Sequence, residues 1–411
     1  MFALGKYITG GDCLKLSLGM ITRDFLTTEP VFDFLENAHK YGHTLHSVVV
    51  AYSREVDMEV VREINQQLKV ELVKINEDEE MYSQLRQQGI SQKSIDTFLK
   101  CPPLDEARSV TYAKNRNNVI TKAFLTGTEV LFFIDTDVYP RLLTKDATGE
   151  MSFKDVDFFG RHLEYLKYDN VAITTSDYSG YYIIPPMAFE GMEMLFKGLQ
   201  KSNACDFILN NQKHHCLVPD NDMQRKTFVT NKILGGNVAI KLDALHDLVP
   251  FFSSSYEVDG RNYLTRGEDT ILGLKVHKHP EFDCIDIDTR IFHNTYSHYP
   301  TVPDVVNDQR IKDRFYFACM GWIGRNPFLN WIQGESTQEM YEIQKKALAI
   351  GAPAVAEYLQ DDRFLRLPEA LERAYDRLNY TIMEYNKFLL AWQEISQQLQ
   401  VRGDEFEDIV S

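Results

Sequence analysis

The chain has 411 residues, of which 44% are hydrophobic and 12% aromatic, so it can bury a large core and is long enough for about two or three domains. Its net charge of -16 argues against a general binder of nucleic acids or of anionic membranes. A nucleotide ligand remains compatible with this charge, because a metal ion can bridge two negative partners.

The cysteines and the apolar runs indicate the cellular setting. The six cysteines are scattered, without a Cys-x-x-Cys pair or a zinc-ligand spacing, which favours reduced thiols. The N-terminal stretch lacks the pattern of a signal peptide, and no apolar run is long enough to span a membrane. We therefore expect a soluble, cytoplasmic protein.

Strands and helices alternate at the start of the chain. Residues 14–21, 46–52 and 70–75 are apolar runs of strand length, and residues 29–41 and 57–68 carry apolar side chains at helical spacing. A βαβαβ order favours a mostly parallel sheet with right-handed crossovers. The predicted fold class is therefore α/β, with helices flanking the sheet.

The alternation continues through the middle of the chain. Residues 77–105 predict a polar surface helix and loop in preference to a functional lid, and residues 144–151 predict a polar loop. The regular elements expected here are helices at 108–126 and 155–168 and strands at 130–134 and 170–175.

The pattern changes toward the C-terminus. Residues 203–230 are predicted to be irregular and residues 261–267 to form a loop. The regular elements expected between and after them are helices at 188–201, 242–248 and 268–277, strands at 233–240 and 282–287, and amphipathic helices at 336–349, 352–359 and 367–400. We therefore predict an α/β domain over residues 1–304 and a mainly helical region over residues 305–411.

Two aspartates directly follow the apolar strand at 130–134. Asp135 and Asp137 stand one residue apart at its carboxyl end, where open α/β sheets bind their ligands. Hard divalent cations prefer oxygen ligands and often bridge protein carboxylates to substrate phosphates. Asp-x-Asp is also common in solvated turns, so the position after a buried strand is what favours a Mg²⁺ or Mn²⁺ site.

A second motif precedes this strand. Arg116-Asn117 lies in the helix at 108–126, and an arginine beside free backbone N–H groups suits a diphosphate, the alternative being a solvated surface arginine. A helix with this Arg-Asn pair, followed by an apolar strand that ends in Asp-x-Asp, resembles the metal-dependent glycosyltransferases of GT-A fold, especially the family-2-like ones. Asn118-Val119 replace the usual Gly-Ile-like continuation.

Two later motifs extend the resemblance. Gly235-Gly236-Asn237 is similar to the segment that borders the acceptor pocket in such enzymes, where glycines let the backbone approach a sugar; the alternative is an ordinary tight turn. Glu268-Asp269 opens a helix and is similar to the family's Glu-Asp motif. The resemblance implies that Asp269 accepts the proton of the acceptor hydroxyl while Glu268 supports it, with helix capping as the alternative.

A histidine is expected to complete the metal site. Many GT-A enzymes, including those similar to mannosylglycerate synthase, place a histidine ligand downstream of the Glu-Asp helix, and His293 stands at the matching position. The alternative is a structural histidine. His298 is the second choice, and the pair His214-His215 has no partner at ligand spacing.

The resemblance covers roughly residues 14–300 and implies a hexosyltransferase-type enzyme (EC 2.4). It would move a sugar from a UDP- or GDP-sugar to the hydroxyl of a small-molecule or glycan acceptor. The C-terminal helices would complete the acceptor side or form a homo-oligomer interface. The implied metal ligands are Asp135, Asp137 and His293, and the implied donor contacts are Arg116, Asn117, Thr22 and Asp135.

Several alternatives stay open. The family's Asp-Asp-Gly-Ser segment for the nucleobase is replaced by Tyr52-Ser53-Arg54-Glu55, which leaves the donor base undetermined. A sugar-1-phosphate nucleotidyltransferase would carry a glycine-rich loop after the first strand, where Thr22-Arg23-Asp24 stands instead. A catalytically silent sugar-binding protein is the other alternative. Inversion and retention of configuration are equally compatible with the motifs.

Overall fold

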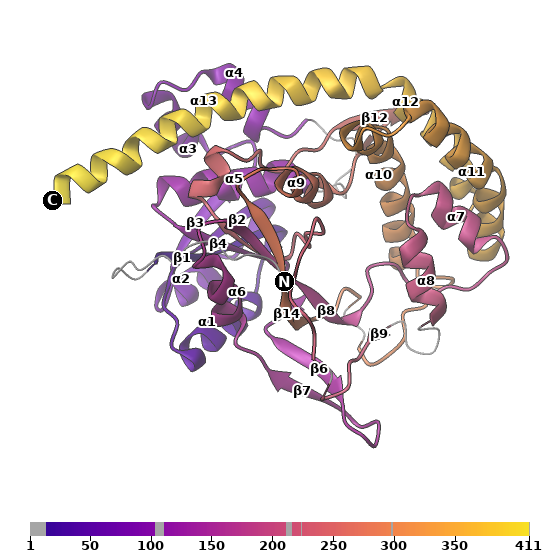
Figure 1. Ribbon diagram of the computed structural model, residues 1–411, viewed down its shortest axis with the longest axis horizontal. Coiled ribbons are helices and arrows are strands. Elements are labelled where there is room, and N and C mark those ends of the chain that lie inside the picture. The colour runs from indigo at the N-terminus through magenta and orange to yellow at the C-terminus, as the bar shows by residue number, and fades with distance from the viewer. Residues whose placement is uncertain (1–13, 103–110, 211–215, 223, 297–298, 411) are drawn as a thin grey trace.

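A ten-stranded sheet with helices on both faces forms the centre of the molecule (Figure 1). The computed structural model describes residues 14–102, 111–210, 216–222, 224–296 and 299–410. The strand order is β10-β14-β8-β11-β4-β1-β2-β3, with β5 and β9 added at β14 and β8. Within these described ranges no helix combines the length and the apolar character that a membrane crossing needs.

The first part of the sheet is parallel, as the βαβαβ pattern predicts. β1 pairs with β2, and β2 with β3, in parallel register. Alternate side chains of these strands enter opposite cores: Val48 and Val50 pack on one face, Val49 and Ala51 on the other. The elements are β1 (Leu16–Phe25), α1 (Glu29–Tyr41), β2 (Leu45–Val56), α2 (Met58–Asn65) and β3 (Lys69–Lys74).

The strand that ends before Asp135 is fully buried. β4 (Val130–Ile134) pairs with β1 in parallel, with Met20 opposite Ile134. Burial on both faces explains its continuous apolar sequence. It follows three helices, α3 (Glu79–Gln87), α4 (Gln92–Leu99) and α5 (Tyr112–Leu125).

The second half of the sheet contains one reversed strand. β11 (Asn237–Lys241) runs antiparallel to both β4 and β8 (Val171–Tyr181), and β14 (Asp283–His293) is parallel to β8. The carboxyl ends of β4, β8 and β14 therefore meet the start of β11 at one edge of the sheet. The mostly parallel sheet of the prediction is confirmed.

Short elements complete this half of the chain, and some lie where loops were predicted. The loop expected at 144–151 includes strand residues of a hairpin in which Lys145 pairs with Met151, and the loop at 261–267 overlaps a strand. These ribbons are too short to show a clear alternation in the sequence. The further elements are β5 (Val138–Tyr139), β6 (Arg141–Lys145), β7 (Met151–Asp155), α6 (Phe158–Leu166), α7 (Met192–Gly198), α8 (Ser202–Asn210), β9 (Cys216–Leu217), β10 (Phe228–Val229), η1 (Asp243–His246), β12 (Ser255–Val258), β13 (Arg261–Leu264) and α9 (Glu268–His277).

The C-terminal region is helical, as predicted, but it differs in detail. Residues 336–349 and 352–359 form one helix that continues through Pro353, and residues 367–400 divide between two helices. A further helix was missed because its side chains are buried nearly all round, which removes the amphipathic pattern. The elements are α10 (Gln309–Gln333), α11 (Thr337–Leu359), η2 (Asp362–Arg366), α12 (Leu367–Asp376) and α13 (Leu378–Val410).

These helices share hydrophobic cores with earlier segments. α10, α11 and α12 pack with α7 and with the β12–β13 ribbon. α13 runs across α4, as Figure 1 shows, and the Trp392 indole donates to the carbonyl oxygens of Leu245 and Leu248, both at 2.9 Å. The helical region is thus built onto the α/β part from two sides.

Candidate active site

A cavity of about 520 Å³ opens at the edge where the parallel strands end. Its wall combines side chains from the ends of β4, β8 and β14 with the start of α9 and the middle of α10. Its size is that of an ordinary small-ligand pocket. The predicted site residues that line it are Arg116, Asp135, Asp137, Gly235, Gly236, Glu268, Asp269 and His293.

Strand pairing joins Asp137 to His293 across a long sequence separation. The two-residue strand β5 pairs antiparallel with β14, which sets His293 opposite Val138. The backbone N–H of Asn294 also donates to the carbonyl oxygen of Asp137 at 2.8 Å. The facing side chains bring His293 Nε2 to 3.7 Å from Asp137 Oδ1.

The ring of His293 is held in one tautomer. Its Nδ1–H donates to the carbonyl oxygen of Tyr181 at 3.1 Å, and its face stacks on Tyr178 with the ring centres 4.5 Å apart. A carbonyl oxygen can only accept, so Nε2 carries the lone pair in the neutral ring. That lone pair faces Asp137, as in histidines that ligate a metal through Nε2.

Asp135 occupies the same cavity beside a buried arginine. Its Oδ1 lies 3.6 Å from Arg116 Nη2. Burial raises the pKa of the Asp135 carboxyl; Arg116 opposes the rise, and the neighbouring Asp137 adds to it. Two carboxylates at close range, in a partly dehydrated cavity, favour the approach of a cation.

The charge of Arg116 is neutralised by carboxylates of the protein itself. Its guanidinium is 3% exposed, forms an ion pair with Glu268, and lies over the rings of Tyr112 and Phe251. The arginine therefore already has carboxylate partners on the protein, and contact with a donor diphosphate stays a prediction.

The two glycines before β11 allow this cluster to close. A β-carbon on Gly235 would come within 2.5–2.7 Å of the Arg116 guanidinium, and one on Gly236 would overlap the Asp135 carboxylate. Gly235-Gly236 thus serves close packing against charged side chains. Contact of these glycines with an acceptor sugar stays a prediction.

The start of α9 separates the roles of its two acids. Glu268 is buried and bound to Arg116, and burial raises the pKa of its carboxyl while Arg116 opposes that rise. Asp269 lines the cavity and accepts from the backbone N–H groups of Thr270, at 2.7 Å, and Gly235, at 3.3 Å. Of the two, Asp269 is the carboxylate placed to meet a ligand hydroxyl.

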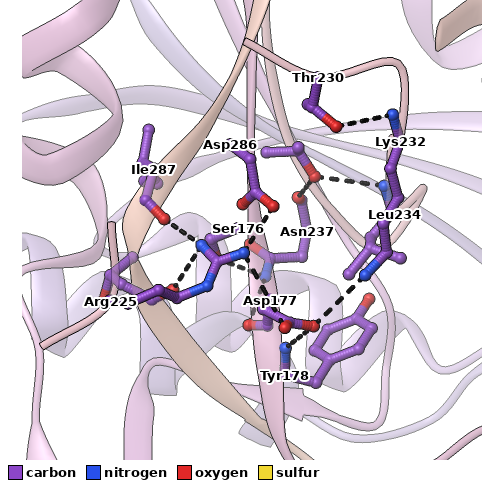
Figure 2. A network of polar contacts seen from close by, with 12 residues as sticks. Ser176, Asp177, Tyr178, Arg225, Thr230, Lys232, Leu234, Asn237, Asp286 and Ile287 are labelled. Carbon is purple, nitrogen blue, oxygen red and sulfur yellow. Dashed lines mark hydrogen bonds and ion pairs between the residues drawn. The ribbon is translucent and has the colours of Figure 1, made fainter. Parts of the chain in front are cut away.

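A polar network behind the cavity fixes the end of β8. Figure 2 shows Arg225 reaching Asp286, at 2.5 Å, and the backbone oxygen of Ile287. Asp177, which lines the cavity, lies 3.6 Å from Lys232 Nζ and 3.9 Å from Arg225 Nη2. Nothing in the sequence pattern singles out these residues, because their partners come from four separate segments.

Three predicted ligand contacts are placed elsewhere. Asn117 is fully buried and its amide donates to the carbonyl oxygen of Phe251 at 2.9 Å. Asn237 is buried at the start of β11, where its amide donates to Ser176 Oγ at 2.6 Å. Both are structural residues, which corrects the expectation, because a side chain turned into the core cannot reach the cavity. Thr22 lies outside the cavity lining, with its hydroxyl bonded to the Asp24 carbonyl oxygen at 2.8 Å.

The metal ligand set fits in part. His298 and the pair His214-His215 lie outside the described residues. Within the described ranges, no three His, Cys, Asp or Glu side chains already converge as a metal site. The donor chemistry of the facing pair, one carboxylate and one imidazole nitrogen, nevertheless suits a divalent cation, and the added nitrogen favours Mn²⁺ over Mg²⁺. Asp137 and His293 are the residues that would hold it, with Asp135 beside them.

Several cavity residues lie outside the predicted site. Arg314 has Nη2 3.8 Å from Asp137 Oδ2, and Lys201, Trp322 and Arg325 line the wall formed by the helices. They lie far from every recognised motif in the sequence. The motif that identifies Asp135 and Asp269 has no counterpart for them. Only tertiary packing brings them to the site, Arg314, Trp322 and Arg325 on α10 and Lys201 on the segment after α7.

Comparisons with known proteins give matches among solved structures. No family model and no curated protein matches the chain. A mannosyltransferase from Pyrobaculum calidifontis in complex with GDP-Man and Mn²⁺ is 13% identical, with a TM-score of 0.39, over 92% of this chain and 88% of that chain. Glucosyl-3-phosphoglycerate synthase from Mycobacterium tuberculosis in complex with Mg²⁺ and uridine-diphosphate is 10% identical, with a TM-score of 0.39, over 79% and 80%. S. aureus TarS is 10% identical, with a TM-score of 0.34, over 94% and 91%.

The matched structures include enzymes of the class that the sequence motifs resemble. A likeness of this degree carries no conclusion about activity.

Proposed function

We propose that the protein is a glycosyltransferase that moves a sugar from a nucleoside-diphosphate sugar to an acceptor hydroxyl and requires a divalent cation. The observation that carries this proposal is the cavity in which Asp137 and His293 Nε2 face each other while Asp269 stands at the start of α9. A cation site and a proton acceptor in one pocket are what sugar transfer from a diphosphate needs. The transferred group would be a hexose.

The residues divide the work. Asp137 and His293, with Asp135, would hold Mn²⁺ or Mg²⁺, which when bound neutralises the leaving nucleoside diphosphate. Asp269 takes the proton of the acceptor hydroxyl if configuration inverts, and orients the acceptor if configuration is retained. Arg116 and Glu268 hold each other, which fixes Asp135 and the start of α9 relative to one another.

Replacement of the facing carboxylate tests the proposal. Asp137→Ala should lose Mn²⁺-dependent binding of UDP and GDP in isothermal titration, while thermal unfolding stays nearly unchanged because this side chain is 25% exposed and its ion pairs are long. Asp155→Ala is the matched control, since Asp155 is exposed on β7 outside the cavity. Metal-dependent nucleotide binding that survives in Asp137→Ala contradicts the proposal.

A second variant separates binding from chemistry. Asp269→Asn keeps the side-chain shape and an acceptor oxygen for the N–H of Gly235 or Thr270. It should bind Mn²⁺ and nucleoside diphosphate as the unmodified protein does, and lose transfer of sugar to an acceptor. Full transfer activity in Asp269→Asn would remove Asp269 from the mechanism.

A further inference from the structure

One wall of the cavity carries positive charge without a carboxylate partner. Among the described residues, six cationic and five acidic side chains line the cavity, although the whole chain has a net charge of -16. Arg116, Arg314 and Lys232 have carboxylate neighbours within 4.0 Å. In the part of the chain that the structure describes, no ion pair joins the other three, Lys201, Arg266 and Arg325, to an acid, and Arg266 lies over the ring of Tyr112.

Arg325 is the more deeply buried of the two. It is 3% exposed, its Nη2 donates to Asn326 Oδ1 at 3.1 Å, and its Nε is buried without a hydrogen-bond partner among the described residues. Burial lowers the pKa of its guanidinium to about 10. Asp269 and Glu268 oppose that decrease in pKa, but neither forms an ion pair with Arg325, so an anion in the cavity would offset the cost of burying this charge.

Lys201 faces the same space. It follows α7, and its ammonium lies 4.9 Å from the centre of the Trp322 ring. Burial lowers the pKa of this ammonium to about 7, and Arg325 adds to the decrease. The two cations therefore act on each other within one wall, where both would gain from a shared negative ligand.

A buried amide network holds Arg325 in place. Asn326 Nδ2 donates to Gln344 Oε1 at 3.4 Å, and Gln344 Nε2 donates to the Tyr375 hydroxyl at 3.2 Å. Asn330 reaches the same hydroxyl at 3.0 Å and accepts from Gln200, next to Lys201, at 2.8 Å. The network connects α10, α11 and α12 with the segment that carries Lys201, so both cations are preorganised.

The location relative to Asp269 assigns a role. A β-carbon on Gly267, the residue before α9, would lie 2.6 Å from Arg325 Nη1, so the guanidinium lies directly against the start of that helix. The proton acceptor Asp269 is two residues further along. A ligand anion on Lys201 and Arg325 would therefore bring the rest of the ligand to Asp269.

We propose that Lys201 and Arg325 form an anion subsite that recognises a carboxylate or phosphate group on the acceptor. This inference rests on the proposed function and narrows it: the acceptor is a small hydroxyl compound with a negative group, and its hydroxyl lies at Asp269. The helical C-terminal region thus contributes the arginine that selects the acceptor. The diphosphate of the donor belongs to the other side of the cavity, at Asp137 and His293.

Anion binding without metal or nucleotide tests the subsite. The probes are inorganic phosphate and glycolate, titrated separately into the full-length protein by isothermal calorimetry, so that phosphate and carboxylate ligands are distinguished. Lys201→Met and Arg325→Met should each lower the affinity for the anion by about tenfold or more, which corresponds to the loss of one charged hydrogen bond. Lys197→Met, an exposed lysine one turn before Lys201 on α7, is the matched control and should bind as the unmodified protein does.

The outcomes separate the two proposals. Asp137→Ala should keep phosphate or glycolate binding while it loses Mn²⁺-dependent nucleotide binding, and Lys201→Met should show the reverse. If neither anion binds, if Lys201→Met binds the better anion normally, or if GDP with Mn²⁺ displaces that anion competitively, the acceptor subsite is wrong. Lys201→Met carries the test alone if Arg325→Met fails to fold.

Discussion

Adding one methyl group beside Asp135, by Gly236→Ala, tests whether this carboxylate takes part in cation binding. Gly236 has no positive φ, so alanine there meets no backbone strain, unlike the left-handed glycines of this chain. Its β-carbon would lie 2.8 Å from the Asp135 β-carbon and would overlap the carboxylate itself. Asp135 is 33% exposed at the side chain, so its carboxylate can rotate toward the open cavity, but rotation leaves its β-carbon in place and the backbone must also shift. We expect Gly236→Ala to displace this carboxylate and to cost about 1–3 kcal/mol of stability.

The same change at Gly235 should displace Arg116 instead of Asp135. There the β-carbon would meet the Arg116 guanidinium at 2.5–2.7 Å, and Arg116 is 3% exposed and bound to Glu268. A buried side chain without free space must shift its surroundings, which costs about 1–3 kcal/mol. Urea unfolding should therefore show a decrease in the free energy of unfolding for both Gly235→Ala and Gly236→Ala.

Cation binding should also decrease in Gly236→Ala, because the change displaces the Asp135 carboxylate. Disturbing a group that supports a metal site typically lowers metal affinity by about 10–100-fold. Titration of Mn²⁺ in the presence of UDP or GDP should show a loss in this range for Gly236→Ala. Normal Mn²⁺ affinity in Gly236→Ala, in a protein whose Asp135 side chain has moved in a crystal structure, would show that Asp135 takes no part in cation binding.

Three further changes test separate parts of the site. Glu268→Gln leaves Arg116 with only the longer contact to Asp135. We expect urea unfolding to show that the free energy of unfolding decreases by about 3 kcal/mol, the low end for a broken buried ion pair. A change near zero would mean that the pair is not buried in solution. His293→Phe keeps a ring stacked on Tyr178 but removes Nε2. The affinity for Mn²⁺ in titration should therefore decrease by about tenfold or more. An unchanged affinity would exclude His293 as a metal ligand. Sulfate, whose charge is constant near neutral pH, should bind less well as pH rises through about 7, because Lys201 loses its proton there. The charged groups that face Lys201 are Arg325, Asp269 and Lys232. Calorimetry at several pH values measures this dependence, and Lys201→Met should remove it.

The sheet was predictable because its chemistry is local. β4 is apolar at every position since both of its faces are covered, and β2 sends Val48 and Val49 into different cores. Such runs are visible in the sequence without any tertiary information. The helix α10 was not predictable, because burial on all sides gives it no polar face. Without a polar face, its sequence cannot be told from that of any other buried segment.

Adjacent residues of one sequence motif can point to different places, one side chain into the cavity and the next into the core. Arg116 reaches the cavity wall, whereas Asn117 turns into the core and donates to Phe251, because α5 is buried continuously from Asn115 to Ala123. A helix without a solvent-exposed face offers no sequence signal for which side meets the ligand. Resemblance to a motif therefore located the cavity to within a turn of helix but could not assign the contact.

The charge of the whole molecule and that of the cavity act on different ligands. At physiological salt, charges are screened over about 8 Å, so a large polyanion approaching the surface meets the net charge of -16 and is repelled. A small anion that enters the 520 Å³ cavity meets Lys201 and Arg325 at short range in a partly dehydrated wall. The acidic surface and the cationic subsite together favour small anionic acceptors over charged polymers. This selection follows from placing Arg325 on α10 and Lys201 after α7, away from the carboxylates that face the cation site.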